Sequence, residues 1–168
     1  MELLVVRHAV AQEREVFAKT GEDDTRRPLT REGRRKFVKG ARGLRKLVPR
    51  VDLLATSELV RALETAELLE AGYGELRTAR LAELAPDADP RALLRWLRAQ
   101  RRRKVVAIVG HEPHLSRAVA YLLTGQPSGF VRLEKGGACL LAWEGAPAAG
   151  RAELRWLLEA RQLRRLGR

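Results

Sequence analysis

Apolar residues along the chain form short runs that are separated by longer stretches with helical spacing. Residues 3–6 and 105–109 are uninterrupted apolar runs, and residues 51–55 form a third that contains one aspartate. Runs of this length, bounded by polar or turn-forming residues, are typical of strands that are buried on both faces. Amphipathic stretches that predict helices cover residues 31–48, 58–71, 90–101 and 113–124. Strands that alternate with helices predict a mostly parallel sheet with helices on both faces.

Residues with helix-capping chemistry mark where these predicted helices begin and end. Thr30, Ser57 and Asp89 each precede a helical stretch, and side-chain oxygens of this kind accept hydrogen bonds from free backbone N–H groups at a helix start. Asp89 is followed by a proline, which is favoured at the first helical position. Gly72 and Gly125 follow two of the stretches and are typical of helix ends.

The remaining segments predict loops, a hairpin and a tail. Residues 20–28 are polar and predict a loop, and residues 76–84 predict a short strand followed by a loop. Residues 138–143 and 152–158 flank a turn rich in Gly, Pro and Ala, so they predict an antiparallel hairpin at one edge of the sheet. Residues 161–168 are expected to form a basic tail. The predicted fold class is therefore a three-layer α/β/α arrangement around a mostly parallel sheet.

Length and composition predict a single domain over residues 1–168. The chain has 168 residues, of which 45% are apolar, and a chain of this size buries roughly two-thirds of its unfolded surface. No apolar run approaches the ~20 residues of a membrane helix, and the first residues do not resemble a secretion signal. One cysteine excludes an internal disulfide, and three histidines in all disfavour a Cys/His zinc cluster. We therefore expect a soluble, cytoplasmic protein without a metal or cofactor.

The charge balance is strongly basic. Lys and Arg number 33 against 21 Asp and Glu, which gives a formal net charge of +12 at pH 7. A basic surface attracts polyanions, so nucleic acid is one candidate partner. A genome that favours Arg and avoids Asn accounts for the same composition, and an aromatic content of 5% offers little material for base stacking. Nucleic acid is therefore the less favoured partner.

Polar residues follow the predicted strands at the points where the strands end. Arg7 and His8 come directly after residues 3–6, and His111 follows the run at residues 105–109. Arg61 lies early in the helix that follows the strand at residues 51–55. Ligands of open parallel sheets bind outside the carboxyl ends of the strands, so these four side chains are expected to meet at one edge of the sheet.

The residue types at this edge suit phosphoryl transfer. A guanidinium group presents a planar fork of donors that matches phosphate oxygens, and a neutral imidazole is a competent nucleophile near neutral pH. The positive charges of Arg7 and Arg61 would hold His8 neutral until substrate arrives. The sequence contains neither a P-loop nor a Gly-x-Ser-x-Gly elbow. We therefore expect transfer of a phosphoryl group to a histidine.

Four short motifs occur along the chain in a fixed order. They are Leu4-Val5-Val6-Arg7-His8-Ala9, Arg27-Pro28-Leu29-Thr30-Arg31-Glu32-Gly33, the set Ser57, Arg61-Ala62 and Thr65-Ala66, and Gly110-His111-Glu112-Pro113. The ordered set resembles the histidine phosphatase superfamily, which has a phosphoglycerate mutase-like fold, and the second motif resembles the small SixA-type phosphohistidine phosphatases. The resemblance covers most of the chain and implies a metal-independent phosphatase.

The resemblance also implies roles for the motif residues. His8 would be the nucleophile and would carry a transient phosphoryl group. Arg7, Arg61 and His111 would hold the phosphoryl oxygens. Arg27 would reach the phosphate or its leaving group, although a loop arginine without the motif would be read as a solvated charge.

The general acid is assigned to Glu83 by the same resemblance. Glu83 lies in Leu81-Ala82-Glu83-Leu84-Ala85-Pro86, which is similar to a stretch of SixA-type sequences. The alternative is a loop carboxylate that pairs with a surface arginine. Phosphohistidine depends less on such an acid than an alkyl phosphate does, because its P–N bond breaks readily once the imidazole is protonated.

Three further residues are expected to have no catalytic role. His114 lies in the first turn of its predicted helix, where we expect it to be exposed to solvent. Glu112 sits near a helix start, where the helix dipole accounts for an anion. Cys139 lies in an apolar run and is expected in the core.

The substrate class stays open between three alternatives. Only residues 13–26 and 126–135 could form a lid in so short a chain, and an open site suits a phosphorylated protein side chain, such as phosphohistidine on a phosphotransfer protein. The second alternative is a phosphatase of small phosphomonoesters with the same fold. The third is a non-catalytic module that binds phosphate or nucleic acid and uses the positive charge.

Overall fold

The fold is organised around one mixed β-sheet. The computed structural model describes residues 1–74, 76 and 78–168, and within them a sheet of six strands has the order β3-β2-β4-β1-β5-β6. The strands are β1 (Glu2–Arg7), β2 (Leu53–Thr56), β3 (Thr78–Arg80), β4 (Val105–Gly110), β5 (Ala138–Ala142) and β6 (Glu153–Leu158). Strands β1 to β4 run parallel, whereas β5 is antiparallel to β1 and β6 is antiparallel to β5. The predicted parallel sheet with an antiparallel edge hairpin is confirmed.

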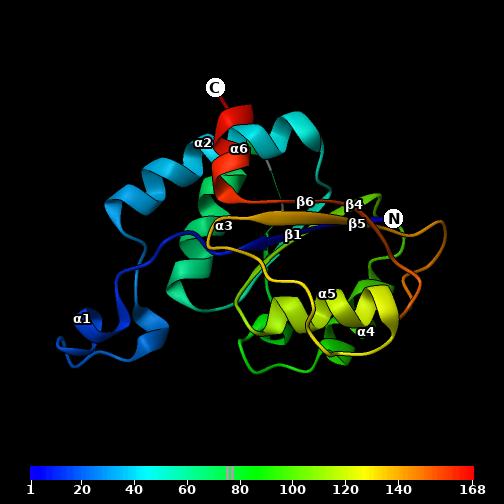
Figure 1. The fold of residues 1–168 in the computed structure, drawn as a ribbon, viewed down its shortest axis with the longest axis horizontal. Helices are drawn as coiled ribbons and strands as arrows, with labels where there is room; N and C mark the ends of the chain where they lie inside the picture. Colours follow the sequence, from blue (N-terminus) through cyan, green and yellow to red (C-terminus); the bar gives the residue numbers. More distant parts are fainter. Residues whose placement is uncertain (75, 77) are drawn as a thin grey trace.

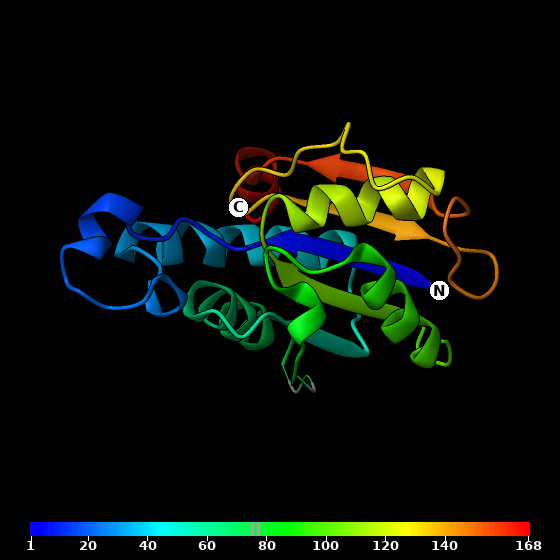
Figure 2. The ribbon, with the colours of Figure 1, turned by 90° about the horizontal axis from the view of Figure 1, so that it is seen from below.

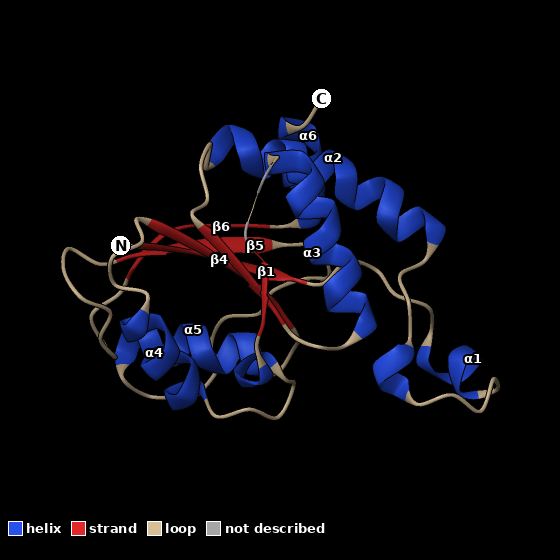
Figure 3. Cartoon of the chain, turned by 180° about the vertical axis from the view of Figure 1, so that it is seen from behind, coloured by secondary structure: helices blue, strands red, loops and turns tan. Residues whose placement is uncertain are grey.

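Helices cover both faces of this sheet, as Figure 1 and Figure 3 show. The α-helices are α1 (Arg14–Ala18), α2 (Arg31–Leu47), α3 (Val60–Tyr73), α4 (Pro90–Ala99), α5 (His114–Thr124) and α6 (Ala160–Leu166), and the 3-10 turns are η1 (Asp24–Arg26) and η2 (Ala82–Leu84). Helices α2, α3 and α6 lie on one face, and α4 and α5 lie on the other. In Figure 2, α1 and the chain around it extend beyond the end of the sheet. Among the helices in the described part of the chain, none combines the length and the apolar character needed to cross a membrane.

The core consists of two apolar layers, one on each side of the sheet. Leu3 and Val5 of β1 pack into the layer beneath α4 and α5, whereas Leu4 and Val6 pack into the layer beneath α2, α3 and α6. Successive side chains of a strand point to opposite faces. A strand that is covered on both faces therefore needs an uninterrupted apolar run, which is the pattern that predicted β1 and β4.

Several predicted helix boundaries are confirmed by their caps. The Thr30 hydroxyl accepts a hydrogen bond from the backbone N–H of Gly33 at 2.9 Å, at the start of α2. The Asp89 carboxylate accepts from the N–H of Arg91 at 3.0 Å, with a proline at the first position of α4. Gly125 ends α5 with a φ of 81°, a backbone conformation that favours glycine.

Ser57 does not have its predicted capping role. The following helix begins at Val60 with Leu59 as its N-cap, and the Ser57 hydroxyl accepts from the N–H of Leu59 outside the helix. The helix also continues past Gly72 to Tyr73 and ends at Gly74, whose φ is 91°. The side chain of Ser57 is left free to contact a histidine, as described below.

Two helices were not predicted. Residues 161–168, predicted as a basic tail, form most of α6, which packs on α2 through the buried Leu163. The short α1 lies in a polar stretch and buries only Phe17. Each helix buries a single side chain, so neither produces a periodic apolar pattern. The predicted strand and loop at residues 76–84 correspond to β3 and η2, and residue 77 of this stretch lies outside the described residues.

The close packing of α2 on α6 requires glycine at position 43 but not at position 40, one helical turn earlier. A Cβ atom on Gly43 would collide with the carbonyl oxygen of Leu163, whereas a Cβ on Gly40 would meet nothing closer than the Leu163 Cβ at 3.9 Å. We therefore expect Gly43→Ala to lower the free energy of unfolding by about 1–3 kcal/mol through overpacking. Gly40→Ala, the matched control, is expected to raise it by about 0.5–1 kcal/mol through helix propensity. Urea unfolding of both variants measures the difference, and equal effects would contradict this account of the contact.

Candidate active site

The register of β1 on β4 places the two predicted histidines side by side. Arg7 is paired with Gly110 at the carboxyl ends of the two strands, and His8 and His111 are the next residues of each. The backbone N–H of His8 donates to the carbonyl of Gly110 at 3.0 Å. The centroids of the two imidazole rings are 5.0 Å apart, with an angle of 48° between the ring planes. The structure therefore brings together two side chains that are far apart in sequence.

His8 is a neutral imidazole with a defined tautomer. Its Nδ1 lies 2.7 Å from the carbonyl oxygen of Ala9. Because a carbonyl can only accept, Nδ1 carries the proton and Nε2 has a free lone pair. Burial lowers the pKa of His8 to about 3, with smaller contributions from the positive charges of Arg61 and Arg7. A deprotonated Nε2 over the physiological pH range is the form required of a nucleophile.

His111 is held by Ser57 at the end of β2. The His111 Nε2 lies 2.8 Å from the Ser57 Oγ, and the His111 Nδ1 is buried without a hydrogen-bond partner in the described part of the chain. The pKa of His111 is lowered to about 2, mainly by burial and to a smaller extent by the neighbouring His8 and Arg61. Ser57, predicted as a helix cap, therefore has a contact with a histidine of the site instead.

Two arginines flank the histidines, of which Arg7 is half-buried and Arg61 is buried. Arg7 donates from Nη1 to the carbonyl of Leu133 at 2.8 Å, and Arg61 donates from Nη1 to the carbonyl of Asp24 at 2.9 Å. The Nε atoms of Arg7 and Arg61 are buried and have no partner within the described residues. Burial is the main cause that lowers the pKa of both guanidinium groups. Since guanidinium nitrogens can only donate, these N–H groups are suited to an anionic acceptor.

Arg27 lies in the site and forms an ion pair with Asp24, a residue that the sequence did not predict to take part. Its Nε donates to the Asp24 Oδ1 at 2.7 Å, and its Nη1 donates to the carbonyl of Gln12 at 2.7 Å. The second carboxylate oxygen of Asp24 lies 3.3 Å from the Nη1 of Arg61. The hydrogen bond from Arg27 is the main cause that lowers the pKa of Asp24. The only signal for Asp24 in the sequence is an acidic residue three positions before Arg27, in a stretch full of charges.

A single cavity collects most of the predicted site residues. Its lining comprises Arg7, His8, Glu13, Arg14, Asp24, Arg27, Leu59, Arg61, Pro86, His111, Glu112, Pro113 and Lys135. Glu83 does not line it: this residue lies half-buried in η2, and Pro86, three residues later, reaches the cavity instead. The role of Glu83 as an acid stays a prediction. Within residues 1–74, 76 and 78–168, no group of three or more His, Cys, Asp or Glu residues is arranged to hold a metal ion.

Glu112 does more than face a helix start. Its carboxylate accepts hydrogen bonds from the Ser116 hydroxyl and, at 3.2 Å, from the backbone N–H of Leu133. The carbonyl of the same Leu133 accepts from Arg7. Glu112 therefore fixes the segment that orients Arg7, and its negative charge offsets part of the lowering that burial causes in the pKa of that guanidinium.

The predicted exposure of His114 is wrong. His114 is fully buried, and neither ring nitrogen has a partner among the described residues. It is the first residue of α5, and its burial together with that of Leu115 and Ser116 shows that even the first helical turn is covered. Burial lowers its pKa to about 4, with Arg117 as the next cause. Cys139 is buried in the core as predicted, and burial raises the pKa of its thiol to about 12.

The tautomer of His8 can be tested directly. We expect its ring to stay neutral, with the proton on Nδ1, from pH 8 down to pH 5, because its pKa lies near 3 and not near the ordinary ~6.5. Nitrogen-15 NMR of the imidazole rings measures both the tautomer and the titration. A midpoint for His8 between pH 6 and pH 7 would contradict the assignment.

His114 offers a test of stability that is separate from the cavity. Leu at this position removes two buried nitrogens that have no partner among the residues described, so His114→Leu is expected to raise the free energy of unfolding by about 1–3 kcal/mol. Because the folded pKa of His114 is lowered to about 4, wild-type His114 takes up a proton on unfolding between about pH 4 and pH 6.5. Stability is lost as the pH falls through that window, and the variant is expected to lose less. Thermal unfolding at pH 7 and pH 5 checks both effects, and an unchanged pH dependence would refute the second.

Comparison with known proteins agrees with this geometry. Residues 3–86 match the histidine phosphatase superfamily (branch 1). An uncharacterized protein from Picosynechococcus is 34% identical over 140 residues, which is 82% of each chain. The structure of the protein histidine phosphatase SixA complexed with tungstate is similar, with a TM-score of 0.83 at 20% identity, over 97% of this chain and 99% of the other. The alpha-ribazole phosphatase from Shigella flexneri gives a TM-score of 0.71 at 20% identity, over 95% and 97% of the two chains. The chain therefore belongs to the histidine phosphatase superfamily, branch 1.

Proposed function

We propose that this member of the histidine phosphatase superfamily hydrolyses phosphohistidine through a covalent intermediate on His8. The observation that carries the proposal is the cluster of buried donors around a deprotonated ring nitrogen. The Nε atoms of Arg7 and Arg61 and the Nδ1 of His111 are buried and have no partner in the described part of the chain, and the proton of His8 is held on Nδ1, away from its free lone pair. A tetrahedral oxyanion beside the His8 Nε2 would supply the acceptors that these donors lack.

In this proposal the cationic groups hold the phosphoryl oxygens and His8 attacks. Arg7, Arg61 and Arg27 bind oxygens through charge-assisted hydrogen bonds, each worth on the order of 1.5–3 kcal/mol. His111 contributes a neutral donor when its Nδ1 carries the ring proton and its Nε2 accepts from Ser57. These groups also stabilise the charge on the oxygens in the transition state, because they lie in a buried site and are already oriented.

The reaction then has two steps whose atoms balance. In the first, a bond forms between the His8 Nε2 and phosphorus while the P–N bond of the substrate breaks, and the departing imidazole takes a proton. In the second, water attacks the phosphoryl group on His8, which releases inorganic phosphate and returns neutral His8. The Nδ1 hydrogen bond to the Ala9 carbonyl is kept throughout, so it supports the positive charge that the ring bears while phosphorylated.

The leaving group favours phosphohistidine over an alkyl phosphate. An imidazole nitrogen has a pKa of about 6.5 and is readily protonated from solvent, whereas an alkoxide needs a positioned proton donor. Glu83, the predicted donor, does not line the cavity. The likeness to the protein histidine phosphatase SixA supports the same choice and suggests a phosphorylated protein as partner.

The alternative is hydrolysis of a small phosphomonoester. It is favoured by the likeness to an alpha-ribazole phosphatase and by the carboxylates of Glu13 and Glu112 in the cavity lining, either of which could supply a proton. The ratio of kcat/KM values for phosphohistidine and for a series of alkyl monoesters decides between the two substrates.

Replacement of the nucleophile is the central test. His8→Ala is expected to lower kcat on phosphohistidine by at least about a thousandfold, because alanine has no nitrogen on which the intermediate can form. His114→Leu is the matched control, since it removes a buried imidazole outside the cavity lining and should retain activity. Rapid quenching with phosphorus-32 substrate should trap an acid-labile, base-stable phosphoryl group on the wild type and on His114→Leu, but not on His8→Ala.

Two further results would contradict the proposal. Near-wild-type turnover by His8→Ala would exclude His8 as the nucleophile. Loss of activity after removal of metal ions with EDTA would contradict a metal-independent mechanism. Salt-dependent DNA binding without hydrolysis of any phosphate compound would instead support a non-catalytic module.

A further inference from the structure

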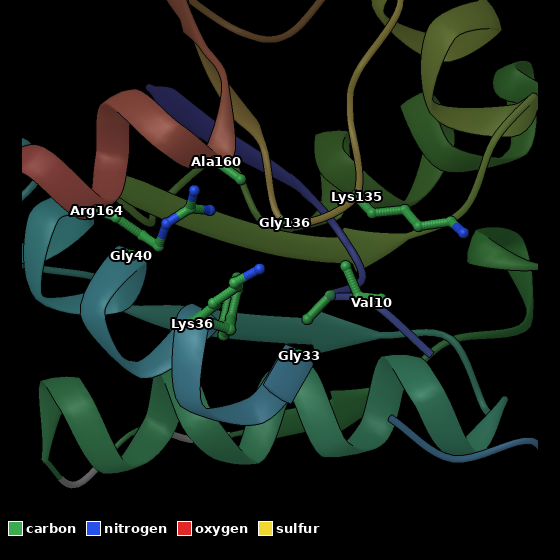
Figure 4. Close-up of a pocket in the computed structure, with 10 residues that line it drawn as sticks. Val10, Gly33, Lys36, Gly40, Lys135, Gly136, Ala160 and Arg164 are labelled. Atoms are coloured by element: carbon green, nitrogen blue, oxygen red, sulfur yellow. The ribbon is translucent and has the colours of Figure 1, made fainter. Parts of the chain in front are cut away.

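A groove with cationic walls lies beside the active-site cavity. It runs between α2, α6 and the segment at residues 132–136, and we name it the basic groove. The walls are formed by Lys36 of α2, Arg161 and Arg164 of α6, and Arg132 and Lys135 of the connecting segment. Figure 4 shows Lys36 and Arg164 reaching the same opening from the two helices. The groove exists because α6, the unpredicted helix, packs against α2.

The basic groove and the active-site cavity are continuous. Arg7 and Lys135 line both of them. Ala9 and Val10, which follow His8 in the chain, belong to the lining of the groove. A molecule that presents a phosphoryl group to His8 must therefore lie next to the groove.

The positive charge of the groove is not neutralised by the protein itself. Lys36 pairs with Glu32, but within the described residues no carboxylate lies within 4 Å of the charged groups of Arg132, Lys135, Arg161 or Arg164. Two carboxylates, those of Glu134 and Glu159, also line the groove. The groove therefore has more cationic than anionic side chains in its lining, which favours an anionic occupant.

The floor of the groove is apolar. Ala9, Val10, Phe37 and Ala160 line its narrow part together with three glycines. The Val10 side chain is among the exposed large hydrophobic residues, at 38% of its surface. An apolar hollow beneath cationic walls suits an apolar side chain that is flanked by carboxylates.

We propose that the basic groove docks an acidic segment of the phosphorylated partner protein, next to the phosphohistidine that enters the cavity. This inference rests on the proposed function and names a determinant of its substrate choice. Charge complementarity supplies the attraction, and the apolar floor favours a polypeptide over the uniformly charged backbone of a nucleic acid. The aromatic side chains that commonly stack on exposed bases are also few in this chain, at 5%.

Two synthetic peptides can test the docking. Both carry one central histidine, phosphorylated chemically with phosphoramidate, and one leucine; the residues beside them are Glu in one peptide and Gln in the other. We expect the wild type to show a kcat/KM about tenfold higher for the Glu peptide at low salt, with the preference falling at 0.5 M NaCl as screening weakens the attraction.

The groove variant is Lys36→Glu with Arg161→Glu and Arg164→Glu. It is expected to lose the preference for the Glu peptide while it turns over free phosphohistidine at the wild-type rate. The matched control is Arg101→Glu with Arg102→Glu and Arg103→Glu, which makes the same change in charge in the exposed turn that precedes β4. This control should keep the preference, and melting temperatures establish that both variants fold.

Each other outcome overturns the inference in a recognisable way. An unchanged preference in the groove variant, or an equal loss in the control, would show that the groove does not select the segment. Loss of duplex DNA binding in the groove variant, with the peptide preference intact, would assign the groove to nucleic acid. Wild-type turnover without any preference refutes docking alone, whereas no wild-type turnover of phosphohistidine in any form refutes the proposed function as well.

Discussion

The parallel pairing of β1 with β4 is the constraint on which the site depends. Its register places Arg7 opposite Gly110, so the next residue of each strand is a histidine and the two rings lie 5.0 Å apart. Both strands are buried on both faces, and a slip by one residue would move every side chain into the opposite layer, where the close packing fits different side-chain shapes. The same burial that stabilises the sheet removes water from the imidazoles and keeps them neutral.

Burial of guanidinium groups beside these imidazoles has a cost that the loops offset. Arg7 and Arg61 each donate to a backbone carbonyl, that of Leu133 and that of Asp24. The two loops that carry these carbonyls come from distant parts of the chain, and each is held by a carboxylate: Glu112 accepts from Leu133, and Asp24 pairs with Arg27. The orientation of the arginines is therefore a property of the loops as much as of the sheet.

The sequence predicted those parts of the structure that a local pattern determines. Strands β1 and β4 follow from their apolar runs, and His8 and His111 follow from the rule that ligands bind at the carboxyl ends of parallel strands. Helix α6 could not be found in this way, since Leu163 is its only buried residue and its basic residues resemble a solvated tail. Its position depends on a tertiary contact with α2.

The same distinction applies within the site. Ser57 contacts His111, and Asp24 forms an ion pair with Arg27. In a sequence, a serine before a helix is more commonly a helix cap, and an aspartate in a charged loop is more commonly a solvated surface residue. The prediction for His114 was wrong for a related reason: the first turn of a helix is often exposed, but here the fold buries it. Side-chain partners across a fold are set by the packing of elements, which a single sequence does not contain.

The charges around the cavity bear on how a phosphate could leave as well as bind. Arg7, Arg14, Arg27, Arg61 and Lys135 line it together with the carboxylates of Glu13, Asp24 and Glu112. Cations alone would bind the substrate, the transition state and the released phosphate alike, and uniform binding of this kind does not accelerate a reaction. Asp24 already pairs with Arg27 and Arg61. Its negative charge therefore cancels part of the attraction that these two arginines would exert on an incoming anion. In the proposed mechanism this balance weakens the hold on inorganic phosphate, while the fixed donors near His8 remain oriented for the transition state.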